Sequence, residues 1–326
     1  MKKKIKISIK AILLMFVITI VAIGIYILYS SLQLTKINPD SDSSFKWPYY
    51  LYINNNVKRQ ALSGEKVNIL VLPNNSMGVT DDFKKDDFMA KFTAIFGKTV
   101  FGDLNTIILV PIFPRPMEHN LIYTHALDRD VFTTDVSELY RLDLQLLAMI
   151  DDVTEIYKKD GWNIESKVLM WGFSASAMYV NRFSIIHPDR VQAVSIGSPG
   201  GWPIAPSKTW EGKILRYPVG IADLDILTGD SINLEGYKRI PQLFFLGDED
   251  TNDSVPYDES FDQADQELVN GLFGDTPVAR WGIAESIYES IDANVQFRLY
   301  KKVGHRPTLK SIIETKDLFR KVMNME

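Results

Sequence analysis

A serine flanked by small residues is the first candidate for chemistry. The chain runs VLMWGFSASAMYV over residues 168–180. This places Ser174 two positions after Gly172 and two positions before Ser176. A nucleophilic serine on a sharp turn between a buried strand and a helix usually lies in the pattern Gly-x-Ser-x-Gly. Here the last glycine is a serine, so the segment taken alone also fits a buried strand and helix without chemistry.

Two residues later in the chain could activate this serine. Asp250 follows the apolar run at 240–246, and His305 follows the run at 294–300. A serine hydroxyl is a weak nucleophile until an imidazole takes its proton. A carboxylate then holds the imidazole in the correct tautomer and stabilises its charged form. The order serine, aspartate, histidine therefore predicts an acyl-transfer site with Ser174, Asp250 and His305.

Other histidines and carboxylates compete for these roles. His119 and His125 precede the serine in a loop, and His187 lies at a predicted helix end, where histidine often has a structural role. Only His305 follows a late strand and precedes the last helix. For the acid, Asp250 is the first choice and Asp253 is the alternative.

The loop at 248–259, DEDTNDSVPYDE, is acidic and could also be interpreted as a calcium site. From Asp248 it runs Asp-x-Asp-x-Asn, with Glu259 at the twelfth position. An EF-hand loop needs glycine at its sixth position, which is Asp253 here, and Pro256 occupies the ninth. We therefore predict a solvated acidic loop and no metal site here. We also predict no cofactor for the protein.

An acyl-transfer site also needs N–H donors for the negative oxygen that develops on the substrate. One donor should be the backbone N–H of Ala175, directly after the nucleophile. The second should come from the loop PNNSMG, where Asn75 is our choice and Asn74 and Ser76 are alternatives. The same residue types also favour an ordinary turn.

The loop at 111–132 carries further charged side chains. Arg115, His125, Asp128 and Arg129 should lie near the same end of the sheet. They could shape a substrate pocket, but a salt-bridged loop is the interpretation we favour.

Strands and helices alternate along most of the chain, which predicts an α/β fold with a mostly parallel sheet flanked by helices. Short runs rich in Val and Ile are typical of strands buried on both faces. A long helix is expected at 135–161 and an irregular insertion at 200–239. The expected strands lie within 49–55, 66–73, 105–114, 167–173, 190–199, 240–247 and 294–303, and further helices lie within 175–187 and 308–324.

The N-terminus predicts export. Residues 1–10 are basic, with five lysines, and residues 11–29 are almost wholly apolar. A helix of 19 residues spans roughly the 30 Å hydrocarbon core of a bilayer. We predict a cytoplasmic segment at 1–10, a transmembrane anchor at 11–29, a linker at 30–44 and one extracytoplasmic domain at 45–326. A cleaved signal peptide is the alternative.

Composition excludes several classes of protein. The net charge of −5 gives no general affinity for nucleic acid. The absence of cysteine excludes disulfides, a thiol nucleophile and zinc sites built on thiolates. The sequence does not indicate an oligomeric state.

From about Tyr49 onward the chain resembles the α/β-hydrolase superfamily, and within it the polyhydroxybutyrate-depolymerase and esterase-like branch. The resemblance rests on LVLPNNS, GFSASA, HPDRVQAVSIGSPGG, FFLGDEDTND and VGHRP, in this order. It implies a triad of Ser174, Asp250 and His305, no metal, and an ester as substrate. Two features depart from the pattern: Ser176 replaces glycine, and PNN stands where such enzymes often have His-Gly. The alternative is an inactive surface binding protein on the same fold.

Overall fold

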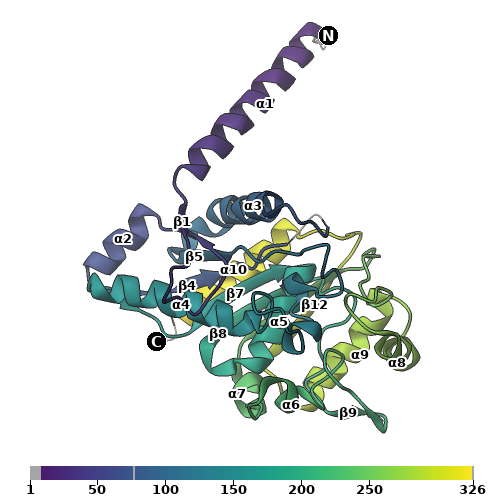
Figure 1. Cartoon of the computed structure of the whole chain (residues 1–326). Coiled ribbons are helices and arrows are strands. Elements are labelled where there is room, and N and C mark those ends of the chain that lie inside the picture. Colours follow the sequence, from purple (N-terminus) through teal and green to yellow (C-terminus); the bar gives the residue numbers. More distant parts are fainter. Residues whose placement is uncertain (1–8, 76–77, 325–326) are drawn as a thin grey trace.

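The computed structural model describes residues 9–75 and 78–324 and is built around an eight-stranded sheet (Figure 1). The strands lie in the order β1-β2-β5-β4-β7-β8-β11-β12. Their bounds are β1 Thr35–Ile37, β2 Tyr49–Tyr52, β4 Ile69–Val71, β5 Ile107–Pro111, β7 Val168–Phe173, β8 Val191–Gly197, β11 Gln242–Gly247 and β12 Val295–Tyr300. Two small pairs lie outside it, β3 Lys66–Val67 with β6 Asn163–Ile164, and β9 Thr209–Trp210 with β10 Lys213–Ile214.

The sheet is parallel from β5 to β12, and only β1 and β2 run antiparallel to their neighbours. The central strands are apolar because both of their faces are covered: every residue of β4, β5 and β8 is buried. Each such Val, Ile or Leu side chain contributes about 1.5–3 kcal/mol through burial. The predicted mostly parallel α/β fold is confirmed.

Helices cover both faces of the sheet. α3 and α10 pack on one face, where Ala90, Ala94 and Phe319 join the strand residues, and α4, α5 and α9 pack on the other. The bounds are α1 Ile9–Ser31, α2 Asn55–Leu62, α3 Phe83–Phe101, α4 Leu142–Lys159, α5 Ala175–Ile186, α6 Leu224–Thr228, α7 Leu234–Arg239, α8 Gln263–Phe273, α9 Pro277–Ser290 and α10 Leu309–Met323. Short 3-10 turns lie at Gly102–Leu104, Thr124–Ala126, Asp130–Phe132 and Pro188–Arg190.

The long helix predicted at 135–161 begins later than expected. Arg141 has φ 48° and ψ 57°, which is outside the helical region, so α4 starts at Leu142. The Arg141 guanidinium makes two hydrogen bonds to the Asp143 carboxylate, at 2.8 and 2.9 Å, and these contacts fix the turn before the helix. The predicted end is confirmed, because Gly161 follows the helix with φ 82°.

The predicted linker and several helices also differ from the sequence prediction. Residues 35–37, in the predicted linker, form β1 and pair with β2, so the sheet begins before residue 45. The segment at 200–239 contains only short elements, as expected of an insertion. Outside this segment, helices α2, α3, α8 and α9 were not predicted.

Helix α1 extends away from the body of the molecule (Figure 1). Its end rests on α3, where the Tyr26 hydroxyl lies 2.7 Å from Thr99 Oγ1 and Lys98 Nζ donates to Ser30 Oγ at 3.0 Å. Within the described residues, no helix has the length and apolar character that crossing a membrane requires. The predicted transmembrane anchor at 11–29 is therefore not supported.

Candidate active site

Ser174 occupies a strained turn between β7 and α5. Its φ of 62° and ψ of −127° lie in a region that costs a non-glycine residue about 1–3 kcal/mol. The turn brings strand and helix so close that a Cβ on Gly172 would lie 2.2 Å from the Ser176 carbonyl oxygen. Only glycine fits at position 172. The side chain of Ser174 stays partly exposed at the carboxyl end of the strand, as a nucleophile requires.

Ser176, which replaces the second glycine of the usual pattern, has a definite role in this turn. Its Oγ accepts a hydrogen bond from the Phe173 N–H and donates one to the Phe173 carbonyl, both at 3.0 Å. The hydroxyl therefore fixes the residue directly before Ser174. The extra side chain does not obstruct the crossing of strand and helix, and it adds two hydrogen bonds to the turn.

Asp250 and His305 contact each other at the same edge of the sheet. His305 Nδ1 lies 3.1 Å from Asp250 Oδ1 and 3.0 Å from Asp250 Oδ2. The Asp250 side chain is fully buried and the His305 side chain is 27% exposed. Because Nδ1 faces the carboxylate, Nε2 is the ring nitrogen left for a reacting group. The His305 ring also packs on Phe173, the neighbour of Ser174, with centroids 4.8 Å apart.

The surroundings of Asp250 favour its charged form. Burial raises the pKa of this carboxyl, but hydrogen bonds from His305, Ser198 and the Asn252 N–H hold the pKa below its usual value. Ser198 was not predicted as a site residue. Its position directly after β8, between the strands that carry Ser174 and Asp250, was the available signal.

The alternative acid, Asp253, has a different partner. Its two carboxylate oxygens lie 2.9 and 2.8 Å from Nη1 of Arg280, a side chain that is 1% exposed. A buried guanidinium needs such a counter-charge. Asp253 is therefore engaged in an ion pair, and Asp250 is the carboxylate that contacts His305.

Other carboxylates of the acidic loop also face cations or backbone donors. Asp248 accepts a hydrogen bond from the Lys302 N–H at 2.6 Å and lies 3.5 Å from Lys301 Nζ. In the part of the chain that the structure describes, no group of three or more His, Cys, Asp or Glu side chains is arranged to hold a metal ion.

Asn75 connects the loop after β4 to the serine turn through its side chain. Its Nδ2 donates to the Phe173 carbonyl at 3.0 Å, and its Oδ1 accepts from the Ser176 N–H at 2.8 Å. Ala175 is the first residue of α5, and N–H groups in the first turn have no partner within a helix. The loop of Asn75 and the N–H of Ala175 are thus brought to the same turn.

Asn74, one of the two alternatives to Asn75, does not take this position. Asn74 is buried, donates to the Phe113 carbonyl at 3.0 Å and lies 3.1 Å from His125 Nε2. These contacts attach the β4 loop to the end of β5. Ser76 lies outside the described residues.

For the ester hydrolysis that the sequence predicts, we expect Asn75→Ala to lower kcat about 10- to 100-fold with little change in KM. The reason is that the variant loses two hydrogen bonds that position the serine turn. Steady-state kinetics on the purified chain measures this split. Asn75→Asp is the matched control: it keeps the acceptor for Ser176 and should retain more activity than the alanine variant. Equal activity of all three proteins would contradict a positioning role for Asn75.

The loop at 111–132 forms a packed polar network, as favoured from the sequence. Arg115 Nη2 lies 3.1 Å from Glu259 Oε1, and its guanidinium stacks 3.8 Å from the centre of the Tyr123 ring. Burial lowers the pKa of His125 to about 4 and raises the pKa of Asp128 to about 7. The ion pair of Arg115 and Glu259 joins the loops after β5 and β11. These two strands lie on opposite sides of β7, the strand that Ser174 follows.

Solved structures share this fold. Poly(aspartic acid) hydrolase-1 from Sphingomonas sp. KT-1 is 14% identical, with a TM-score of 0.55 over 90% of this chain and 97% of that one. LpqC, a poly(3-hydroxybutyrate) depolymerase from Bordetella parapertussis, is 16% identical, with a TM-score of 0.54 over 87% and 97%. The predicted resemblance to the α/β-hydrolase fold is confirmed. No protein-family description and no curated protein matches the sequence.

Proposed function

We propose that this chain is a serine hydrolase that cleaves a carboxylic ester through Ser174, His305 and Asp250. The observation that carries the proposal is the contact of His305 Nδ1 with the buried Asp250 carboxylate, at 3.0 Å. The His305 ring packs on Phe173, the residue before Ser174. The strained turn at Ser174 follows the carboxyl end of β7, the place where α/β folds gather reactive groups, and this supports the proposal.

In the proposed reaction, His305 Nε2 takes the proton of Ser174 as Oγ bonds to the acyl carbon. The carbonyl oxygen becomes negative and accepts hydrogen bonds from the N–H of Ala175 and from the loop of Asn75. The ester C–O bond breaks, and the alcohol leaves with the proton that His305 held. Water then repeats the sequence on the acyl-enzyme and releases the acid. Asp250 stabilises the imidazolium in both halves.

The choice of an ester over an amide or thioester rests on the family resemblance that the sequence motifs carry, because a triad alone does not select the leaving group. Of the two solved structures named above, one is a poly(3-hydroxybutyrate) depolymerase and the other is a poly(aspartic acid) hydrolase, so this fold occurs in hydrolases of different substrates. An ester is also the more sensitive substrate for a first activity assay, because esters are intrinsically hydrolysed faster than amides.

The test is labelling of the purified chain with a fluorophosphonate, together with hydrolysis of p-nitrophenyl acetate, butyrate and octanoate. We expect stoichiometric labelling and turnover of at least one ester. A folded protein that neither labels nor hydrolyses would favour the inactive binding protein on the same fold.

For location we propose that the domain works outside the cytoplasm. The support is the sequence pattern of basic residues 1–10 followed by apolar residues 11–29, which is typical of exported proteins. Protease added to intact cells that produce the full chain should digest the domain. Protection of the domain until the cells are lysed would contradict this location.

A further inference from the structure

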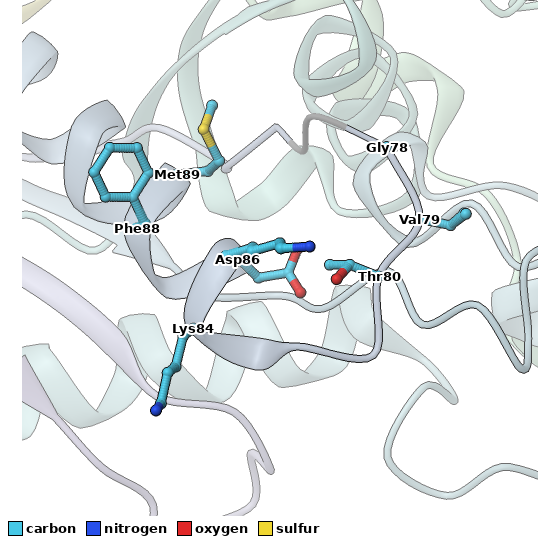
Figure 2. A pocket seen from close by; sticks show the side chains of 8 residues that line it. Gly78, Val79, Thr80, Lys84, Asp86, Phe88 and Met89 are labelled. Carbon is cyan, nitrogen blue, oxygen red and sulfur yellow. The ribbon is translucent and has the colours of Figure 1, made fainter.

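The outer side of α3 exposes two aromatic side chains. Phe88 is 61% exposed and Phe92 is 52% exposed. Because they stand four residues apart, they lie on the same side of the helix. Figure 2 shows Phe88 and Lys84 directed away from the loop of Val79 and Thr80. Neither phenylalanine has a part in the proposed hydrolysis, and within the described residues neither belongs to the hydrophobic core.

The basic side chains of α3 surround this aromatic pair. Three lysines stand three or four residues from Phe88 and therefore border it on the helix surface: Lys84, Lys85 and Lys91. The first two are exposed and the third is half-buried. The long apolar stem of a lysine can lie along apolar surface while its ammonium group stays in water.

The nearby carboxylates are buried or have partners. Asp86 is 1% exposed, and Asp87 forms an ion pair with Lys36 at 2.6 Å. Before the helix, Asp81 and Asp82 each accept a hydrogen bond from a backbone N–H. The side of α3 that carries the two phenylalanines is therefore apolar and positively charged.

Helix α1 adds apolar and aromatic surface beside α3. It leaves the body of the molecule next to α3 (Figure 1), and residues 15–29 are exposed on every side of the helix. A helix that is apolar all round is normally surrounded by apolar groups. At its base, Lys98 Nζ lies 5.6 Å from the centre of the Tyr26 ring and 5.3 Å from that of Tyr29. Tyrosines at the foot of an apolar helix are typical of the level of lipid headgroups.

We propose that the face formed by α3 and the base of α1 rests on an anionic lipid surface. Phe88 and Phe92 reach the acyl chains, and the lysines lie among the headgroups, as in helices that bind in the plane of a bilayer surface. Contact with the lipid surface does not require any helix to cross the bilayer.

Charge favours lipid over a second copy of the chain as the occupant of this face. A symmetric pair of such faces brings lysine against lysine, which repels. An anionic surface instead attracts each lysine close to it. Since the net charge of the whole chain is −5, this attraction is a property of the face and not of the molecule as a whole.

The absence of cysteine from the sequence allows the face to be labelled at single positions. Phe88→Cys, Phe92→Cys and Ile226→Cys are made in the full chain, and each carries the polarity-sensitive dye NBD. Phosphatidylcholine vesicles are added with and without phosphatidylglycerol. We expect NBD emission to shift to shorter wavelength at positions 88 and 92 when phosphatidylglycerol is present. Ile226 is the matched control, because it is apolar and 81% exposed but lies in α6, on the opposite side of the molecule (Figure 1).

The shift should also depend on the lysines. Replacing Lys84 and Lys85 together by glutamine should lower the ratio of docked to undocked face about 30-fold, the effect of removing two charges from an anionic surface. The matched control replaces Lys158 and Lys159, two adjacent exposed lysines at the end of α4, on the other face of the sheet. This control removes the same charge and should leave the shift at position 92 unchanged.

Three outcomes would overturn the proposal: unchanged emission at positions 88 and 92, an equal shift at position 226, or an equal loss of the shift in the α4 control. A shift that needs no vesicles and grows with protein concentration would also overturn it, and would identify a second copy as the occupant. The dye reports the environment of the face whether or not the chain hydrolyses esters, so the result is separate from the proposed hydrolase function.

Discussion

Ser174→Ala should reduce ester hydrolysis by about 10⁴- to 10⁶-fold and eliminate fluorophosphonate labelling, while the protein stays folded. The expected size follows from known serine hydrolases, in which loss of the nucleophile leaves only the rate that binding and oxyanion stabilisation provide. Alanine keeps the Cβ and therefore the strained φ of 62°, and it adds no new contact, so we expect little change in stability. The measurements are kcat with p-nitrophenyl esters and mass spectrometry of the labelled chain.

Ser176→Gly is the matched control, two positions along the same turn. It restores the usual Gly-x-Ser-x-Gly pattern and removes the two hydrogen bonds that Ser176 Oγ makes with Phe173. We expect labelling to persist and the free energy of unfolding to fall by about 1–2 kcal/mol. If Ser174→Ala still labels, a different residue is the nucleophile.

The second large effect distinguishes the two candidate acids. Asp250→Asn should lower kcat about 10⁴-fold, because an amide in place of the carboxylate no longer holds His305 in the required tautomer. Asp253→Asn should act on stability instead. It leaves the buried Arg280 guanidinium without its counter-charge, and breaking such a buried pair costs about 3–5 kcal/mol.

The two variants are compared by kinetics and by denaturant unfolding. We expect Asp250→Asn to be stable and nearly inactive, and Asp253→Asn to be less stable and active at temperatures where it remains folded. If instead Asp253→Asn is stable and nearly inactive while Asp250→Asn is less stable and active, Asp253 is the triad acid. That result would contradict a mechanism based on the contact between Asp250 and His305.

Much of the fold could be predicted from the sequence. The apolar runs that become β4, β5, β7, β8 and β11 are buried on both faces, and this burial is encoded in the types of residue along each run. Ser174 and Asp250 could be proposed as site residues because each stands just past such a run, and His305 because it follows the last strand, β12, which is only partly buried. Parallel strands bring their carboxyl ends to one edge.

Other elements could not be predicted because their signals are weak or non-local. α3 mixes buried Ala90 and Ala94 with exposed Phe88 and Phe92, so its apolar residues do not mark one face. The start of α4 depends on the pairing of Arg141 with Asp143 and on its contact with the distant carbonyl of Thr228. Local periodicity carries no information about that contact.

The sequence by itself determined which residue types stand at the end of which strand, and in what order. Only the tertiary structure decided which partner each side chain takes: Asp250 with His305, Asp253 with Arg280, and Asn75 with the turn at Ser174. The physical reason is that strand burial is a property of consecutive residues. The partner of a loop carboxylate or amide depends instead on which loops and helices, far apart in the chain, meet at the edge of the sheet.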